Sequence, residues 1–168
     1  DAFTDSSPAV AACGDRLHIA FKGLDNDHSY LASSSDPGDE SSWHVVDVDT
    51  IPSVPGSPDD EPAIICTSHT PALTAINGHL WLAFKGHNNP SIWIVALRER
   101  AAGIYELRRY GRLNHAETRR GPSMAGPTAD PIAHVGVSKP PMVVYRGNSD
   151  PSVWLHSYMH SDHDLRLS

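Results

Sequence analysis

Three stretches of this chain are versions of one another, and they limit what it can fold into. The clearest copy covers residues 70–86 and reads Thr70-Pro-Ala-Leu-Thr-Ala-Ile-Asn-Gly-His-Leu-Trp-Leu-Ala-Phe-Lys-Gly86. Residues 7–23 match this copy without a gap, and residues 130–147 match it with one residue added in the middle. The prolines that open the copies, Pro8, Pro71 and Pro131, are 63 and 60 residues apart. A regular period of this size indicates a repeat architecture, in which each unit packs on its neighbours.

Each copy has the pattern of short strands separated by turns. Apolar runs at 9–13 and 17–21 flank Gly14-Asp15, and runs at 72–76 and 80–84 flank Asn77-Gly78. Asn-Gly between apolar runs is a strong hairpin signal, because both turn positions need positive φ. Third strands are predicted at 29–33, 92–96 and 153–158, and fourth strands at 43–49 and 103–110. The chain is therefore predicted to be all-β.

Two segments rich in proline and glycine, 51–62 and 119–130, are predicted to be linkers, because proline does not fit a central strand. Residues 96–102 are the only candidate helix. They have neither a cap nor an apolar stripe, and we predict a loop there. Residues 1–168 are interpreted as one repeat domain, with units at about 7–50, 63–112 and 130–168.

Four strands in a unit of this length describe one blade of a β-propeller. Three blades cannot close a ring, because propellers typically have about 4–8. We therefore expect a homodimer that completes a six-bladed ring by two-fold symmetry. A β-trefoil is also built from three repeats of four strands, and it is the alternative that needs no partner.

Charge and hydropathy exclude some classes of function. The chain carries 13 basic and 20 acidic side chains, a formal net charge of -7. Nucleic-acid binding needs a basic surface, so no nucleic-acid partner is expected. No apolar run approaches the roughly 18 residues of a membrane span. The chain begins at Asp1, which fits a processed mature protein and equally a piece of a longer one, and we expect a secreted, extracellular protein.

Cys13 and Cys66, the only cysteines, lie on or beside the first strand of their units. A disulfide between them would join neighbouring units and add about 3–4 kcal/mol to stability. It would also favour an extracytoplasmic location. The alternative is two buried thiols that never meet.

A cation, an amide or carboxylate, and an aromatic ring recur in one frame around the glycine that ends each second strand. They lie one residue before that glycine, three after it and seven after it. The nine residues are Lys22, Asn26, Tyr30, Lys85, Asn89, Trp93, Arg146, Asp150 and Trp154. A flat ring covers the apolar face of a sugar, and charged or amide donors bond its hydroxyls. The pattern predicts a carbohydrate-binding lectin with repeated, shallow, multivalent sites for glycans. The architectural alternative places the rings in the core and the asparagines in Asx turns.

The repeats resemble those of bacterial β-propeller lectins and their sialidase-like relatives. The resemblance rests on residues 71–86 and on Gly23-Leu-Asp-Asn-Asp-His-Ser-Tyr-Leu-Ala-Ser-Ser34. It covers nearly all of the first two units and about two thirds of the third. Ser34-Ser-Asp-Pro-Gly38 followed by Trp43 is similar to the structural Asp-box turn of that superfamily, with two extra residues before the Trp. The resemblance implies a propeller fold and sugar binding.

Catalysis is not expected, and no catalytic residue is predicted. A sialidase-like glycoside hydrolase, the less favoured alternative, would need three arginines converging on a substrate carboxylate and a Tyr–Glu nucleophile pair. No carboxylate pair stands in an apolar setting as glycoside hydrolysis requires. A protein–protein interaction propeller is the other alternative. His156, His160 and His163 are interpreted as an exposed tail rather than zinc ligands, so no cofactor or metal site is predicted.

Overall fold

The computed structural model describes residues 4, 6–52, 66–126, 141–149, 151–157 and 164–167. Over these residues the chain forms twelve β-strands and no α-helix, so the all-β prediction is confirmed. Two short 3-10 turns, η1 (Glu40–Ser42) and η2 (Val48–Thr50), flank the fourth strand. In this part of the chain no helix has the length and apolar character needed to cross a bilayer.

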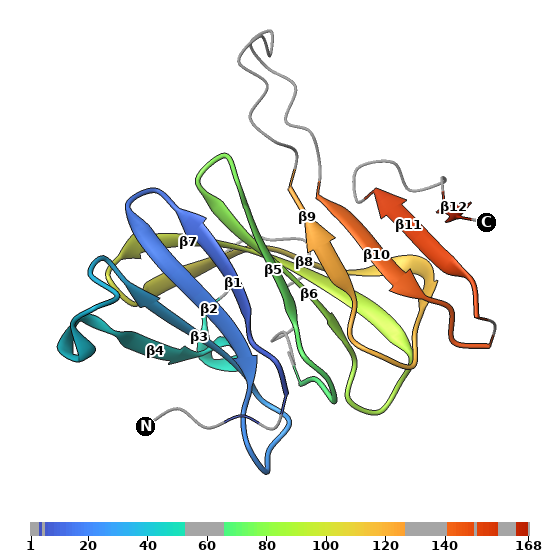
Figure 1. Ribbon diagram of the computed structural model, residues 1–168, viewed down its shortest axis with the longest axis horizontal. Helices are drawn as coiled ribbons and strands as arrows, with labels where there is room; N and C mark the ends of the chain where they lie inside the picture. The colour runs from blue at the N-terminus through green and yellow to red at the C-terminus, as the bar shows by residue number, and fades with distance from the viewer. Residues whose placement is uncertain are drawn as a thin grey trace, which may run out of the picture.

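The strands form three antiparallel sheets of four strands, each running in sequence order. Sheet 1 contains β1 (Ala9–Cys13), β2 (Arg16–Lys22), β3 (Ser29–Ser34) and β4 (His44–Asp47). Sheet 2 contains β5 (Ala72–Ile76), β6 (His79–Lys85), β7 (Ser91–Ala101) and β8 (Ile104–Glu117). Sheet 3 contains β9 (Ser123–Ala125), β10 (Met142–Arg146), β11 (Val153–Ser157) and β12 (Asp164–Leu167). In Figure 1 sheet 1 lies at the left and sheet 3 at the right, with the first strands β1, β5 and β9 side by side.

The first two hairpins turn where the sequence predicts them. Gly14 has a φ of 62° between β1 and β2. Asn77 and Gly78 have φ values of 52° and 75° between β5 and β6. Positive φ at both central positions matches the right-handed twist of the strands, which explains the choice of Asn-Gly there.

Sheets 1 and 2 bury a common core between their faces. A row of paired residues crosses sheet 2 from Leu73 through Leu82 and Val95 to Tyr110. This row packs against Leu31 and its neighbours on sheet 1. Full burial of one such aliphatic side chain contributes about 1.5–3 kcal/mol.

The opposite face of sheet 2 is buried as well. Ala83 and Ile94 pack there against Val143 and Tyr145 of sheet 3 in a second core. Sheet 2 is therefore covered on both sides. For this reason its strands carry apolar side chains on both faces of the sheet, rather than apolar side chains on one face and polar ones on the other.

The prediction of a loop at 96–102 is wrong, because most of this segment belongs to a strand. β7 extends through Ala101 and pairs with β8, which continues to Glu117, beyond the predicted end at 110. Ala96 and Leu97 are both buried although they point to opposite faces. The segment lacks the alternation of a half-exposed strand because its two buried residues are adjacent, and residues 98–102 are exposed or only partly buried.

The first strand of sheet 3 also differs from the prediction. β9 lies at Ser123–Ala125, inside the segment 119–130 that was predicted to be a linker. Pro122 and Gly126 flank the strand without interrupting it, and β9 pairs only with β10, as a strand at a sheet edge does. Residues 130–140 of the third sequence copy lie outside the described residues.

The disulfide between Cys13 and Cys66 is not formed, and both cysteines are free thiols. Cys13 ends β1 at the end of sheet 1 where Glu99 lies nearby. Cys66 precedes Thr67, which pairs with Gly86, and its Sγ is 3.6 Å from Asp49 Oδ2. The two thiols therefore lie toward opposite ends of the sheets, too far apart for a disulfide.

We expect Leu82→Ala to lower the free energy of unfolding by about 2–5 kcal/mol, because it removes a fully buried side chain between sheets 1 and 2. Ile104→Ala is the matched control, since Ile104 is 61% exposed, and it should change stability by less than about 0.5 kcal/mol. Urea unfolding followed by tryptophan fluorescence measures both. Equal effects of the two substitutions would contradict the assignment of this core.

Candidate functional site

The glycine that ends each second strand closes the same turn in all three sheets. Its amide nitrogen donates to the carbonyl oxygen five residues later at 2.9–3.0 Å. The pairs are Gly23–His28, Gly86–Ser91 and Gly147–Ser152. The recurring sequence frame around these glycines is therefore a recurring backbone turn.

The two asparagines three residues after the glycine shape this turn from within. Asn26 Oδ1 accepts a hydrogen bond from the amide of His28 at 3.0 Å, and Asn89 Oδ1 accepts one from Ser91 at 3.0 Å. A Cβ on Gly86 would lie 2.6 Å from Asn89 Oδ1, so only glycine leaves room for the amide. Both asparagines stand in Asx turns, as the architectural alternative predicted.

A buried threonine joins each turn to the next sheet. The amide of Thr67 donates to Asp27 O at 2.7 Å, and Thr67 pairs with Gly86. Thr118 repeats this one sheet further on, where its amide donates to Pro90 O at 2.7 Å and it pairs with Gly147. Adjacent sheets are thus connected by the same backbone hydrogen bond.

We call this contact between a turn and the threonine of the next sheet the joint. A motif that the repeat alignment missed occurs at each joint. Thr-x-x-x-Pro occurs as Thr4 to Pro8, Thr67 to Pro71 and Thr118 to Pro122, each time just before a first strand. In each copy the threonine Oγ1 accepts the amide two residues later at 3.1–3.2 Å. The motif would have placed the third unit's first strand at residue 123.

The three predicted aromatic rings all pack against other apolar side chains. Trp93 stacks on Tyr110, with ring centroids 5.1 Å apart. Trp154 packs against the core between sheets 2 and 3. Tyr30 stacks on Phe21 with centroids 5.6 Å apart. These contacts give the rings an architectural role.

The predicted cations have different surroundings in the three sheets. Lys22 is 7% exposed, and its Nζ donates to Gly23 O at 3.1 Å. Lys85 Nζ donates to Ser68 Oγ at 2.9 Å and Gly86 O at 3.0 Å, and burial lowers the pKa of Lys85. Arg146 is exposed. Asp150, the remaining predicted site residue, lies outside the described residues.

Arg146 lines a pocket of about 340 Å³ where β10 ends. The lining residues come from the joint of sheet 3 and the turn after it, and they are Thr118, Arg119, Arg120, Arg146, Gly147, Asn148, Ser149 and Pro151. All three arginines are exposed. The described residues of this lining include no acidic side chain. The pocket can therefore accept a small anionic group.

Further cations lie close to this pocket. Burial lowers the pKa of His69, and the nearby cations Lys85, Arg120 and Lys22 lower it further. His69 and Arg120 hold the same position in successive Thr-x-x-x-Pro motifs. Positive charge thus gathers at this end of the sheets, in a chain whose formal net charge is -7.

Arg119 and Arg120 were missed as site residues, because they fell in a predicted linker. The Thr-x-x-x-Pro motif is the signal that could have found them, since it places both at the joint beside Gly147. His156 was assigned to an exposed tail, which is wrong, because it lies on β11 and is 3% exposed. His160 and His163 lie outside the described residues.

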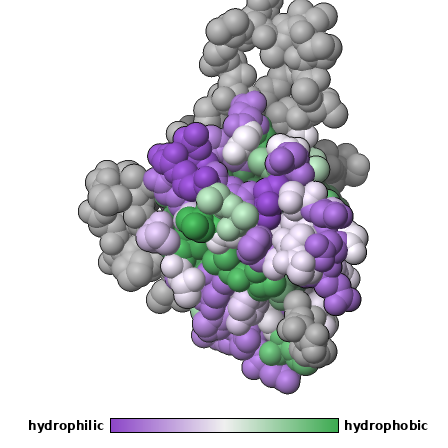
Figure 2. Space-filling model, turned by 90° about the vertical axis from the view of Figure 1, so that its left-hand side faces the viewer, coloured by the Kyte–Doolittle hydropathy of each residue, from purple (hydrophilic) through white to green (hydrophobic). Residues whose placement is uncertain are grey.

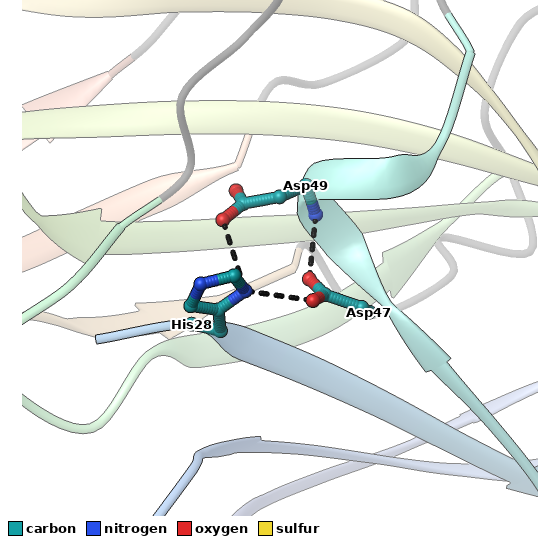
Figure 3. Close-up of side chains that lie close together, drawn as sticks. All are labelled: His28, Asp47 and Asp49. Carbon is teal, nitrogen blue, oxygen red and sulfur yellow. Dashed lines mark hydrogen bonds and ion pairs between the residues drawn. The ribbon is translucent and has the colours of Figure 1, made fainter. Parts of the chain in front are cut away.

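One group of side chains within the described ranges has the composition of a metal site. His28, Asp47 and Asp49 each offer a ligand atom, and these atoms lie within 4.8 Å of one another. Figure 3 shows the two carboxylates directed at the imidazole. The group lies beside the joint between sheets 1 and 2, because His28 ends the turn whose Asp27 carbonyl accepts from Thr67.

Comparison with known proteins gives no assignment for this chain. No protein-family model and no curated protein sequence matches it. The function proposed below therefore rests on the geometry of the residues and on the resemblance of the repeats.

Asn89→Ala should lower the free energy of unfolding by about 1 kcal/mol, because it removes the acceptor for the Ser91 amide inside the turn. Asn88→Ala is the matched control, since Asn88 is an exposed neighbour of the same type. Urea unfolding compares the two variants. A smaller effect of Asn89→Ala than of Asn88→Ala would contradict the structural role of Asn89.

Proposed function

We propose that this protein binds carbohydrate without hydrolysing it, and that its ligand class is acidic glycans. The observation that carries the proposal is the pocket at which Arg119, Arg120 and Arg146 meet. The carboxylate of a uronic or sialic acid, or a sulfate ester, accepts paired hydrogen bonds from a guanidinium fork. Such charge-assisted bonds are about twice as strong as neutral ones.

The rest of the pocket suits a sugar ring. Asn148 and Ser149 supply an amide and a hydroxyl, which bond sugar hydroxyls as donors or acceptors. A volume of about 340 Å³ lies within the range of roughly 300–1,000 Å³ that small-molecule sites occupy, and it suits one or two sugar residues.

The arrangement favours binding by charge over stacking. No aromatic ring stands among the pocket's lining residues, because the predicted rings pack elsewhere. The described part of the lining also has no carboxylate to act as a general acid or nucleophile, as glycoside hydrolysis requires. We therefore propose one acidic-glycan site per chain rather than three equivalent ones.

Arg120→Gln and Arg146→Gln should each weaken binding of a sulfated or sialylated oligosaccharide by about tenfold or more, because each removes a charged hydrogen bond worth about 1.5–3 kcal/mol. Isothermal titration calorimetry at low ionic strength measures the loss. Added salt should weaken binding to the wild-type protein, since screening reduces attraction between exposed charges.

Arg98→Gln is the control, because Arg98 is an exposed arginine of β7 toward the opposite end of sheet 2. The matching neutral oligosaccharide is the second control. If the acidic sugar does not bind, or if Arg98→Gln weakens binding as much as Arg146→Gln, the proposal fails. Binding of an acidic peptide with no binding of acidic sugars would support a protein-interaction role instead.

We also propose that the three sheets are propeller blades, and that a second copy of the chain completes a six-bladed ring. The support comes from the outer face of sheet 1. Val10, Ile19, Ala32 and Val45 pair in one row across its four strands. By repeat position this row is the counterpart of the Leu73-to-Tyr110 row, which is buried against the preceding sheet.

On sheet 1 the row has no preceding sheet among the described residues. Val10 is 55% exposed and Val45 is 53% exposed. Figure 2, seen from the side of sheet 1, shows hydrophobic residues gathered in the middle of this face. The face of sheet 3 that points away from sheet 2 is also apolar. Its residues Met142, Val144 and Leu155 are partly exposed. Sheet 3 of a second copy therefore suits the open face of sheet 1.

Ile19→Glu should shift the protein from dimer to monomer, because it would bury a charge in the proposed contact. Analytical ultracentrifugation measures the change, with Ile104→Glu as the control at an exposed position. The chain mass is 18.2 kDa, so a wild-type protein that sediments at this mass would contradict the ring.

A further inference from the structure

We propose a divalent metal site of the zinc type, formed by His28 Nδ1, Asp47 Oδ2, Asp49 Oδ2 and Cys66 Sγ. Three of the ligands come from sheet 1 and the 3-10 turn after it, and the fourth comes from the segment that enters sheet 2. The site lies beside the hydrogen bond from Thr67 to Asp27, and it is separate from the arginine pocket.

Three of the four ligand atoms lie within 4.8 Å of one another, and the fourth lies beside one of them. His28 Nδ1 lies 2.7 Å from Asp47 Oδ2 and 3.6 Å from Asp49 Oδ2. Cys66 Sγ lies 3.6 Å from the same Asp49 oxygen. Zinc bonds of about 2.0–2.1 Å to nitrogen or oxygen and about 2.3 Å to sulfur place such ligands about 3.3–3.5 Å apart. An ion between His28, Asp47 and Asp49 requires small shifts of these side chains. Cys66 Sγ lies outside the group of atoms within 4.8 Å of one another, so the Cys66 side chain has to turn from Asp49 toward His28 and Asp47 to complete the site.

Hydrogen bonds fix the backbone of His28 and Cys66 and the side chain of Asp47. The amide of His28 donates to Asn26 Oδ1, and its carbonyl accepts from Gly23, so both sides of the residue are fixed. Asp47 Oδ1 accepts the amide of Asp49 at 3.0 Å, which leaves Asp47 Oδ2 directed at the imidazole (Figure 3). The Cys66 carbonyl accepts from the amide of His87 at 3.1 Å. Outer hydrogen bonds of this kind orient metal ligands.

The donor set selects the class of ion. An imidazole, a thiolate and two carboxylates form the mixed nitrogen, sulfur and oxygen set that zinc accepts. Ca²⁺ and Mg²⁺ prefer six or more oxygen ligands, which this group does not supply. When the ion binds, the thiol loses its proton, and the imidazole keeps one proton on Nε2 while Nδ1 coordinates.

An ion at this position would connect sheet 1 to the start of sheet 2 with bonds much stronger than the Thr67 hydrogen bond beside them. All four ligands are only partly buried, so an ion can enter from solvent. We therefore assign the site a structural role, in which the ion strengthens the joint between the two sheets.

The test is titration of the metal-free full chain with Co²⁺ and then with Zn²⁺. Tetrahedral Co²⁺ with a thiolate ligand gives a sulfur-to-metal charge-transfer band in the near ultraviolet and strong visible absorption. We expect both bands at one equivalent, and we expect Zn²⁺ to displace Co²⁺ and to raise the melting temperature. Cys66→Ser should abolish the charge-transfer band, and Asp49→Asn should weaken Zn²⁺ binding by at least about tenfold.

Two controls match these variants. Cys13→Ser removes the other cysteine, at the opposite end of sheet 1, and should leave the spectrum unchanged. Asp25→Asn removes an exposed carboxylate at a φ of 60°, a conformation that asparagine tolerates, and should leave the affinity unchanged. Far-ultraviolet circular dichroism confirms that each variant is folded. A wild-type Co²⁺ spectrum without the thiolate band overturns the proposal, as does a Zn²⁺ affinity that Cys66→Ser and Asp49→Asn both leave unchanged.

Discussion

The burial of sheet 2 on both faces is the constraint on which the rest of the fold depends. A single four-stranded sheet with apolar residues on both faces cannot stay monomeric and folded in water, because each face exposes surface that must be covered. Sheet 1 covers the face that carries Leu82, and sheet 3 covers the face that carries Ile94. On the outer face of sheet 1, by contrast, Val10 and Val45 at the two ends of the corresponding row are more than half exposed. The proposed dimer therefore rests on the packing of the repeats themselves.

The joint between sheets explains why one sequence frame recurs, without a ligand being needed to account for it. In the turns of sheets 1 and 2, the glycine amide, the asparagine side chain and the amide of the buried threonine that follows each hydrogen-bond the turn backbone, so these residues serve the turn. The proposed ligand site lies where one copy departs from the others. Ser68 and His69 occupy two positions of the sheet 2 joint, and Lys85 bonds Ser68 there. In the joint of sheet 3 the same two positions carry Arg119 and Arg120. Together with Arg146 they line the pocket.

Much of the fold could be predicted from the sequence, whereas most of the site could not. The hairpins at Gly14 and Asn77-Gly78 were predictable because turn chemistry is local. β9 was misplaced because the alignment followed apolar similarity and passed over Thr118 and Pro122. The segment 96–102 was misassigned because its two buried residues are adjacent and the residues after them are exposed or only partly buried, which leaves no alternation to detect. Of the proposed pocket and metal ligands, only Arg146 was predicted, since the others meet through contacts between separate units.

By itself, the sequence determined the all-β class, the repeat, the position of the hairpins and the excess of negative charge, because each of these follows from composition or from neighbours along the chain. The tertiary structure decided which copy carries an open cationic pocket, that Cys13 and Cys66 lie too far apart to bond, and that Cys66 lies instead beside Asp49. The physical reason is that packing three sheets face to face sets distances between residues that are far apart in sequence. A repeat pattern specifies the individual sheets, but it does not specify which side chains meet between them.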